Sequence, residues 1–129
     1  LDPGWGGCAA GIVERTVREM VRRLGARPER ILAALGPCIG KCCFETDGDV
    51  PEAMRASALG AEAEPYLERR GEKWHVDLAG LNRQWLLRAG VAPDHIDVCG
   101  LCTACRPDLF WSHRKMGEAR GVQAAVISL

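Results

Sequence analysis

Residues 9–24, AAGIVERTVREMVRRL, constrain the fold more than any other segment, because their apolar side chains recur with the period of an α-helix. Glutamate and arginine side chains occupy the opposite face. We therefore expect the apolar face to pack against the rest of the protein and the charged face to lie in solvent. Gly25 and Pro28 follow at positions typical of a helix end. The segment therefore predicts an amphipathic helix that packs through Ala9, Ile12, Val13, Thr16, Val17, Met20, Val21 and Leu24.

The rest of the chain alternates between helical and extended patterns. Asp77 has the side chain of a helix N-cap and stands just before a run of apolar residues at helical spacing. Short apolar or alternating runs elsewhere favour strands. The order of these elements predicts an α/β (α+β) fold. Helices are expected at 49–59, 61–70 and 77–89, and strands at 31–35, 73–76, 96–98 and 122–129.

The chain shows no internal repeat, linker or low-complexity tract, so residues 1–129 are expected to form a single domain. It begins with Leu1 rather than methionine, and Gly4-Trp5-Gly6-Gly7 follows with no leading element. We interpret this start as lying within a larger structure, so that the domain would be incomplete at its N-terminus.

Charge and hydropathy exclude several classes of partner. Seventeen basic and seventeen acidic residues balance, which argues against a broad surface for nucleic acid or for anionic membrane. No apolar run approaches the roughly 20 residues that span a bilayer. The sequence shows no secretory signal, so we expect a cytoplasmic protein with reduced thiols.

Seven cysteines stand out, three of them in GPCIGKCCFE at 36–45 and three in a C-x2-C-x2-C run at 99–105. Thiols this close can cross-link the chain, bind a metal or act as nucleophiles, and a reducing compartment disfavours the first use. Leu109 stands where an iron–sulfur run of this kind needs its fourth cysteine. A zinc site using Cys38, Cys42, Cys99 and Cys102 is one interpretation, and buried or loop thiols without a metal are the other.

The three histidines, His75, His95 and His113, lie far apart and show no metal-binding spacing. A lone histidine on a strand is more often structural than a ligand. A Cys/His hydrolase would need one of them beside Cys42 or Cys43 in the folded chain.

The segment 110–121, FWSHRKMGEARG, combines basic and aromatic side chains. Arg114 and Arg120 suit phosphate oxygens, and Trp111 offers a face on which a base can stack. A solvated turn is the simpler alternative.

Four segments together resemble the YfiH-type laccase-domain, or polyphenol-oxidase-like, family, now regarded as purine nucleoside phosphorylases with side activities on adenosine. The segments are PGWGGCAAGIVERTV at 3–17, LGPCIGKCCFE at 35–45, VDL at 76–78 and CT…LFWSHRKMGEARG at 102–121. Family members are nearly twice as long, so this chain resembles their C-terminal portion. The resemblance implies an α/β mixed-sheet sandwich with flanking helices, shared with a toxin deamidase.

The family binds zinc, or copper on older interpretations, through a histidine, a cysteine and a second histidine. By resemblance Cys42 is the cysteine ligand and a candidate catalytic residue. Asp2 stands at the position of the first histidine, where it could offer a carboxylate to the metal. Leu59 lies near the place of the second histidine. Arg114 and Arg120 match the closing motif of the family.

The resemblance therefore implies a purine nucleoside phosphorylase, active or degenerate, that cleaves adenosine or inosine with phosphate. Arg114 and Arg120 would bind phosphate, and Trp5 or Trp111 would pack against the base. The partners would be small molecules, a nucleoside and phosphate. Three alternatives stay open: a copper-dependent polyphenol oxidase, a non-catalytic zinc-binding domain rich in thiols, and a cysteine hydrolase related to the toxin.

Overall fold

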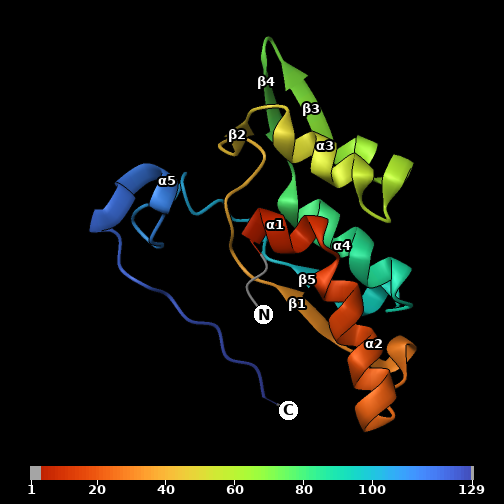
Figure 1. The fold of residues 1–129 in the computed structure, drawn as a ribbon. Coiled ribbons are helices and arrows are strands. Elements are labelled where there is room, and N and C mark those ends of the chain that lie inside the picture. The colour runs from red at the N-terminus through yellow and green to blue at the C-terminus, as the bar shows by residue number, and fades with distance from the viewer. Residues whose placement is uncertain (1–3, 129) are drawn as a thin grey trace.

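A computed structural model describes residues 4–128 and contains short helices around two small sheets (Figure 1). The sequence-based α/β fold class is confirmed, because a parallel sheet and an antiparallel sheet both occur with flanking helices. The α-helices are α1 (Gly4–Ala9), α2 (Ile12–Leu24), α3 (Asp49–Ala56), α4 (Leu78–Arg88) and α5 (His113–Met116). The strands are β1 (Ala33–Leu35), β2 (Glu45–Thr46), β3 (Leu67–Arg70), β4 (Lys73–Val76) and β5 (Ile96–Val98). Single turns of 3-10 helix are η1 (Pro28–Arg30), η3 (Pro93–His95) and η4 (Gly117–Ala119), and η2 (Gly60–Tyr66) is longer.

The predicted amphipathic helix is present as α2, and a shorter helix, α1, precedes it. Gly11 separates the two with a φ of 66°, a backbone conformation that favours glycine. A side chain at Gly11 would also meet the ring of Trp85 at 3.1 Å, so α1, α2 and α4 converge at this point. Within residues 4–128, no helix has the length and apolar character needed to cross a membrane.

The hydrophobic core lies where α4 meets α2, α3 and the inner face of β4. Trp85, Met54 and Leu81 are its largest buried side chains. The predicted N-cap of α4 is confirmed, because the Asp77 carboxylate accepts a hydrogen bond of 2.9 Å from the amide of Gly80. Burial of these apolar side chains supplies the main stabilisation of this half of the molecule.

The two sheets differ in pairing. β1 and β5 run parallel, with Ala33 opposite Ile96, and the segment between them crosses over through α4. β4 lies between β2 and β3 and pairs with both in antiparallel fashion. The predicted strands at 73–76 and 96–98 are confirmed, and the strand predicted at 31–35 is present over its last three residues.

The prediction of a helix at 61–70 is wrong for the second half of this segment. Residues Gly60–Tyr66 form a 3-10 helix, and Leu67–Arg70 form a strand instead. Pro65 inside the helical turn removes an amide donor, and backbone pairing of Leu67 with Val76 then draws the following residues into the sheet. Here tertiary pairing outweighs the helical composition of an Ala/Glu-rich segment.

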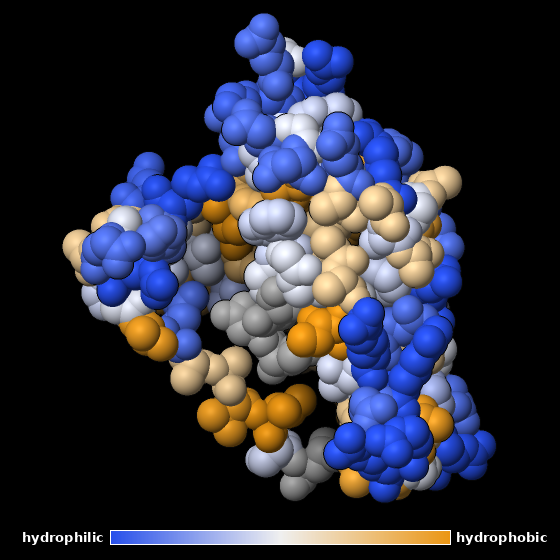
Figure 2. Space-filling model, in the orientation of Figure 1, coloured by the Kyte–Doolittle hydropathy of each residue, from blue (hydrophilic) through white to orange (hydrophobic). Residues whose placement is uncertain are grey.

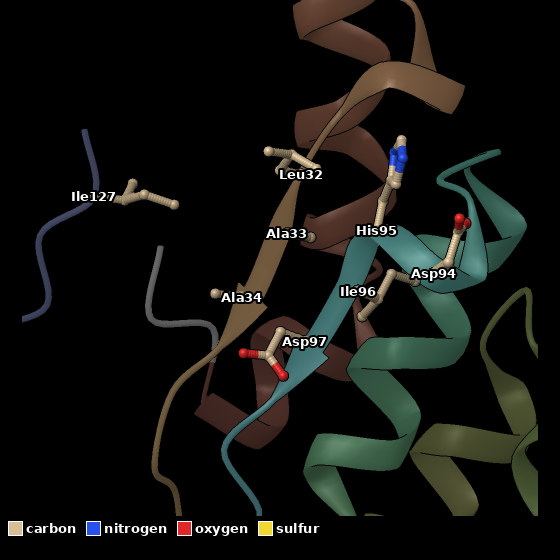
Figure 3. Close-up of a pocket in the computed structure, with 8 residues that line it drawn as sticks. All are labelled: Leu32, Ala33, Ala34, Asp94, His95, Ile96, Asp97 and Ile127. Atoms are coloured by element: carbon tan, nitrogen blue, oxygen red, sulfur yellow. The ribbon is translucent and has the colours of Figure 1, made fainter. Parts of the chain in front are cut away.

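The terminal strand predicted at 122–129 is absent over 122–128, the part that the structure describes. These residues extend from α5 along one side of the molecule, and their apolar side chains stay exposed (Figure 2). A hollow of about 420 Å³ separates Ile127 from β1, where Leu32 and Ala34 face it (Figure 3). β-prone composition alone does not make a strand, because a strand needs a partner that accepts its hydrogen bonds.

Candidate functional site

The parallel strands β1 and β5 bring the two cysteine-rich segments together at their carboxyl ends. Beyond the strands, the amide of Cys99 donates to the carbonyl of Leu35 at 2.9 Å, and the amide of Thr103 donates to the carbonyl of Cys38 at 2.9 Å. Cys38 and Cys102 also form an isolated parallel bridge. The carboxyl edge of a parallel sheet is a common place for binding sites, because the loops that leave the strands converge there.

Four cysteines from these two segments form one compact group. The Sγ atoms of Cys42, Cys43, Cys102 and Cys105 all lie within 4.8 Å of one another. Cys105 Sγ lies 3.6 Å from Cys42 Sγ and 3.4 Å from Cys43 Sγ. We call these four residues the thiol cluster. Among residues 4–128 it is the only group of histidine, cysteine and acidic side chains placed to share a metal ion.

The membership of the thiol cluster corrects the sequence interpretation. Cys42 and Cys102 belong to it as expected, but Cys43 and Cys105 replace Cys38 and Cys99. Cys38 is half-buried within the bridge to Cys102, and Cys99 is exposed just after β5. The C-x2-C spacing of Cys102 and Cys105 was the available signal, since it places two thiols on one tight turn.

Backbone amides converge on one sulfur of the thiol cluster. The amide of Gly40 donates to Cys102 Sγ at 3.2 Å, and the amides of Ala104 and Cys105 donate to the same sulfur. Burial on its own would raise the pKa of the Cys102 thiol, but these three amides and the Cys42 side chain together outweigh it and lower the pKa to about 6. Cys102 is therefore held largely as a thiolate at neutral pH.

Hydrogen bonds hold the loop that carries Cys42 and Cys43 against β4. His75 is buried on β4, and its Nδ1 forms a hydrogen bond of 2.7 Å with the carbonyl of Lys41. The amide of Val76 donates to the carbonyl of Phe44 at 3.2 Å. His75 is thus a structural residue, as expected for a lone histidine on a strand. Among residues 4–128 no hydrogen bond joins a histidine to Cys42 or Cys43, so the pairing that a cysteine hydrolase requires is not observed.

The three-ligand metal site implied by resemblance does not fit this chain. Leu59, near the position of the second histidine, is a buried core residue with an aliphatic side chain that cannot bind a metal. The other expected ligand, Asp2, lies outside the described residues. The thiol cluster offers a different donor set, and four soft sulfur atoms suit zinc or copper(I).

Both candidate anion-binding arginines lie in or beside α5. Arg114 donates from Nη1 to the carbonyl of Glu45 at 2.8 Å, and its guanidinium lies over the ring of Phe44 at 5.6 Å. This contact brings it to the loop that carries Cys42. Arg120 donates from Nε to His113 Nδ1 at 3.2 Å. Neither arginine pairs with a carboxylate within the part of the chain that the structure describes.

The two candidate tryptophans lie on different parts of the molecule. Trp111 is exposed just before α5, where its amide donates to Gln123 Oε1 at 3.2 Å, and its ring packs against Gly121. Trp5 is exposed on α1, which stands apart from α5 in Figure 1. Trp111 therefore shares a segment with the arginines, while Trp5 would have to approach a ligand from another element.

The fold and the site define an α/β protein with a cysteine-rich site at the carboxyl edge of a small parallel sheet. Comparison with known proteins identifies the family within this class of α/β proteins. The family model described as multi-copper polyphenol oxidoreductase laccase matches residues 3–129, and the chain belongs to this laccase-domain family.

Relatives and solved structures agree with this assignment. A purine nucleoside phosphorylase of Deinococcus radiodurans is 45% identical over 98% of this chain and 46% of its own length. The purine nucleoside phosphorylase YlmD of Geobacillus stearothermophilus is 36% identical over 96% of this chain and 45% of its own length. The crystal structure of the hypothetical protein YfiH of Bacillus licheniformis superposes with a TM-score of 0.81 at 38% identity, covering 87% of this chain and 42% of that one. The chain therefore spans about half the length of the curated relatives it matches.

Proposed function

We propose that this chain takes part in the phosphorolysis of a purine nucleoside, adenosine or inosine. Relatives that carry the name purine nucleoside phosphorylase support the reaction class. The observation that carries the proposal for this chain is the placement of Arg114 beside the loop of Cys42, with no carboxylate partner among residues 4–128. An arginine left without a carboxylate is suited to bind an anion such as phosphate.

In this reaction an oxygen of phosphate forms a bond to C1′ of the ribose while the bond from C1′ to the purine nitrogen breaks. The departing base keeps the electron pair and takes up a proton, which gives a free purine and ribose 1-phosphate. The protein must therefore hold an anion and a flat base in a fixed relation. Arg114 and Arg120 would bind the phosphate oxygens. Trp111, or Trp5 from α1, would cover one face of the purine.

Cys42 belongs to the proposed site through its loop. It stands two residues before Phe44, the ring over which the Arg114 guanidinium lies. Loss of Cys42 should therefore disturb the position of Arg114 as well as remove a thiol. We expect the Cys42→Ala and Arg114→Ala variants to lose activity together.

The test is incubation of the purified chain with adenosine or inosine, with and without phosphate, followed by chromatography of the products. The proposal requires free purine and ribose 1-phosphate that appear only when phosphate is present. Arg114→Ala should abolish most of this product. Arg27→Ala is the matched control, because Arg27 is an exposed arginine paired with Glu29 far from α5.

Three results would contradict the proposal. One is ribose 1-phosphate no higher than with heat-denatured protein, and a second is equal loss in the Arg114→Ala and Arg27→Ala variants. The third is inosine as the only product from adenosine, which would indicate deamination instead. A copper-dependent polyphenol oxidase is less well supported, because His75, His95 and His113 lie on separate elements and join no shared metal group within residues 4–128.

A further inference from the structure

We propose that Cys42, Cys43, Cys102 and Cys105 bind one zinc ion in a closed four-thiolate site that joins the loop after β1 to the loop after β5. The site is structural rather than catalytic, and it differs in composition from the histidine-containing site that the resemblance implies. This inference does not depend on the proposed phosphorolysis, because it concerns the ligands and the stability of the chain.

The distances within the thiol cluster fit a tetrahedral zinc site. Four sulfur atoms at the usual zinc–sulfur distance of about 2.3 Å stand about 3.8 Å apart at the corners of a tetrahedron. Two of the separations here are 3.6 Å and 3.4 Å, and all of them are within 4.8 Å. Side-chain shifts of about 1 Å or less would therefore complete the coordination shell around an ion at the centre.

The backbone around Cys102 is arranged to hold a charged sulfur. Amides of Ala104 and Cys105, the second and third residues after Cys102, donate to its Sγ, so the C-x2-C turn folds around its own first thiol. The amide of Gly40 donates to the same atom from the other loop at 3.2 Å. Hydrogen bonds to a metal-bound sulfur orient the ligand and offset its negative charge, which is the usual role of groups just outside a metal shell.

Gly40 also permits the close approach of the two loops. A Cβ at this position would stand 3.1 Å from Cys102 Cβ and 3.3 Å from Cys42 Sγ. Contacts this short leave room for a glycine and for little else unless both cysteines move. The position therefore couples one ligand from each loop.

The number of ligands determines what the ion can do. Four protein thiolates fill a tetrahedral shell, whereas a catalytic zinc has three protein ligands and keeps one position for water or substrate. Binding would replace the thiol protons with the metal and release them to the buffer. Because Cys42 and Cys105 are exposed, the ion would be reachable by a chelator from solvent.

The test is zinc analysis of the full chain purified under reducing conditions, with zinc supplied alone as the probe. We expect one zinc per chain, and cobalt in its place should give the visible bands of a tetrahedral four-thiolate site. Cys105→Ser should weaken zinc binding by more than the roughly 100-fold typical of losing a group outside the shell. Cys99→Ser is the matched control, because Cys99 is an exposed thiol on the same segment that does not belong to the thiol cluster.

A second measurement separates binding from folding. Circular dichroism should show that the Cys105→Ser chain keeps its helices, so weaker binding can be assigned to the lost ligand. Reduced wild-type chain that holds no zinc after dialysis against excess zinc would overturn the proposal. Equal loss in Cys99→Ser and Cys105→Ser would also overturn it, as would a disulfide from Cys105 to Cys42 or Cys43 as the main form under reducing conditions. A chain that binds zinc yet forms no ribose 1-phosphate would count against the proposed function alone.

Discussion

The helical core and the C-terminal arm of this protein are held in different ways. We define the helical core as α1, α2, α3 and α4 with β4, and the C-terminal arm as residues 99–128. The core buries large apolar side chains such as Trp85, Met54 and Leu81. The residues buried in the arm, Thr103, Ala104 and Ser112, are all small. Several large apolar side chains of the arm, among them Leu109, Trp111 and Ile127, are exposed instead.

The arm is attached through directional contacts. Two of its amides donate to carbonyls of β1 and of the loop after it. The Arg114 side chain donates to the Glu45 carbonyl, and two thiols of the arm complete the thiol cluster. Apolar burial is spread over many atoms and tolerates small shifts, whereas hydrogen bonds and metal ligands fail when one partner moves. The stability of the core should therefore depend on filled volume, and the attachment of the arm on each ligand and hydrogen-bond donor.

The largest effect is expected from a cavity in the core. Leu81 is completely buried on α4, and Leu81→Ala should lower the free energy of unfolding by about 2–5 kcal/mol. The matched change in the arm is Leu109→Ala, where the side chain is 55% exposed and the expected effect is within about 0.5 kcal/mol. Urea unfolding followed by circular dichroism measures both. Similar losses at the two sites would show that the arm, like the core, is held by apolar burial.

Alkaline pH should weaken the core through Cys8. Burial raises the pKa of the Cys8 thiol from 9.0 to about 12, with the Trp85 side chain beside it opposing the shift. Above pH 9 the unfolded chain loses this proton while the native chain keeps it, so the native state binds more protons and stability falls as pH rises toward 12. The loss attributable to Cys8 is at most about 4 kcal/mol near pH 12.

The Cys8→Ala chain isolates this contribution from the response of the rest of the protein to high pH. The difference in unfolding free energy between the wild-type and Cys8→Ala chains should stay constant below pH 9 and shrink above it. A difference that is independent of pH up to 11 would contradict the assignment.

A pair of glycine substitutions in the loop after β1 tests how the arm is attached to that loop. Gly40→Ala would press its Cβ against Cys102 and Cys42, so zinc should bind about 10–100-fold more weakly, equivalent to about 1.4–2.7 kcal/mol. Gly36→Ala is the control, because a Cβ there would meet nothing within 4 Å. Competition with a chromophoric chelator measures both. Unchanged affinity in Gly40→Ala would show that the two loops need not approach so closely.

The smallest effect is expected at Arg114. Arg114→Ala removes one hydrogen bond to the Glu45 carbonyl and should cost about 0.5–1.5 kcal/mol. Cleavage of the arm by protease at low enzyme concentration should become faster. Arg106→Ala should leave that rate unchanged, because Arg106 pairs with Asp108 inside the arm itself. Faster cleavage in Arg106→Ala alone would indicate that Arg114 does not hold the arm in place.

The sequence predicted the core better than the arm, for a physical reason. The amphipathic helix, the Asp77 cap and the strands at 73–76 and 96–98 depend on local periodicity and on side chains within a few residues. These elements occur as α2, α4, β4 and β5. The missed strand β3 depends on Val76 across the hairpin, and the absent terminal strand depends on whether a partner is available. Local sequence carries neither kind of information.

The candidate site was likewise predicted only in part, and for the same physical reason. The sequence identified Cys42 and Cys102 as candidate ligands. The contacts of Cys105 with Cys42 and Cys43 could not be predicted in this way, because they join residues 63 and 62 positions apart in sequence. Cys43, which the sequence did not identify as a zinc ligand, joins the thiol cluster because the parallel pairing of β1 and β5 brings Cys105 next to it. Sequence spacing does not report which loops meet at the edge of a sheet.

Hydrogen–deuterium exchange with and without zinc can show whether a metal held by the thiol cluster fixes the arm to the body of the protein. Chelation of zinc should speed exchange at 38–44 and 99–106, where the amides of Gly40, Ala104 and Cys105 lose a fixed sulfur acceptor. Exchange in α4 should not change, because its protection comes from the buried core. Exchange that is the same in both loops with and without zinc would contradict the account.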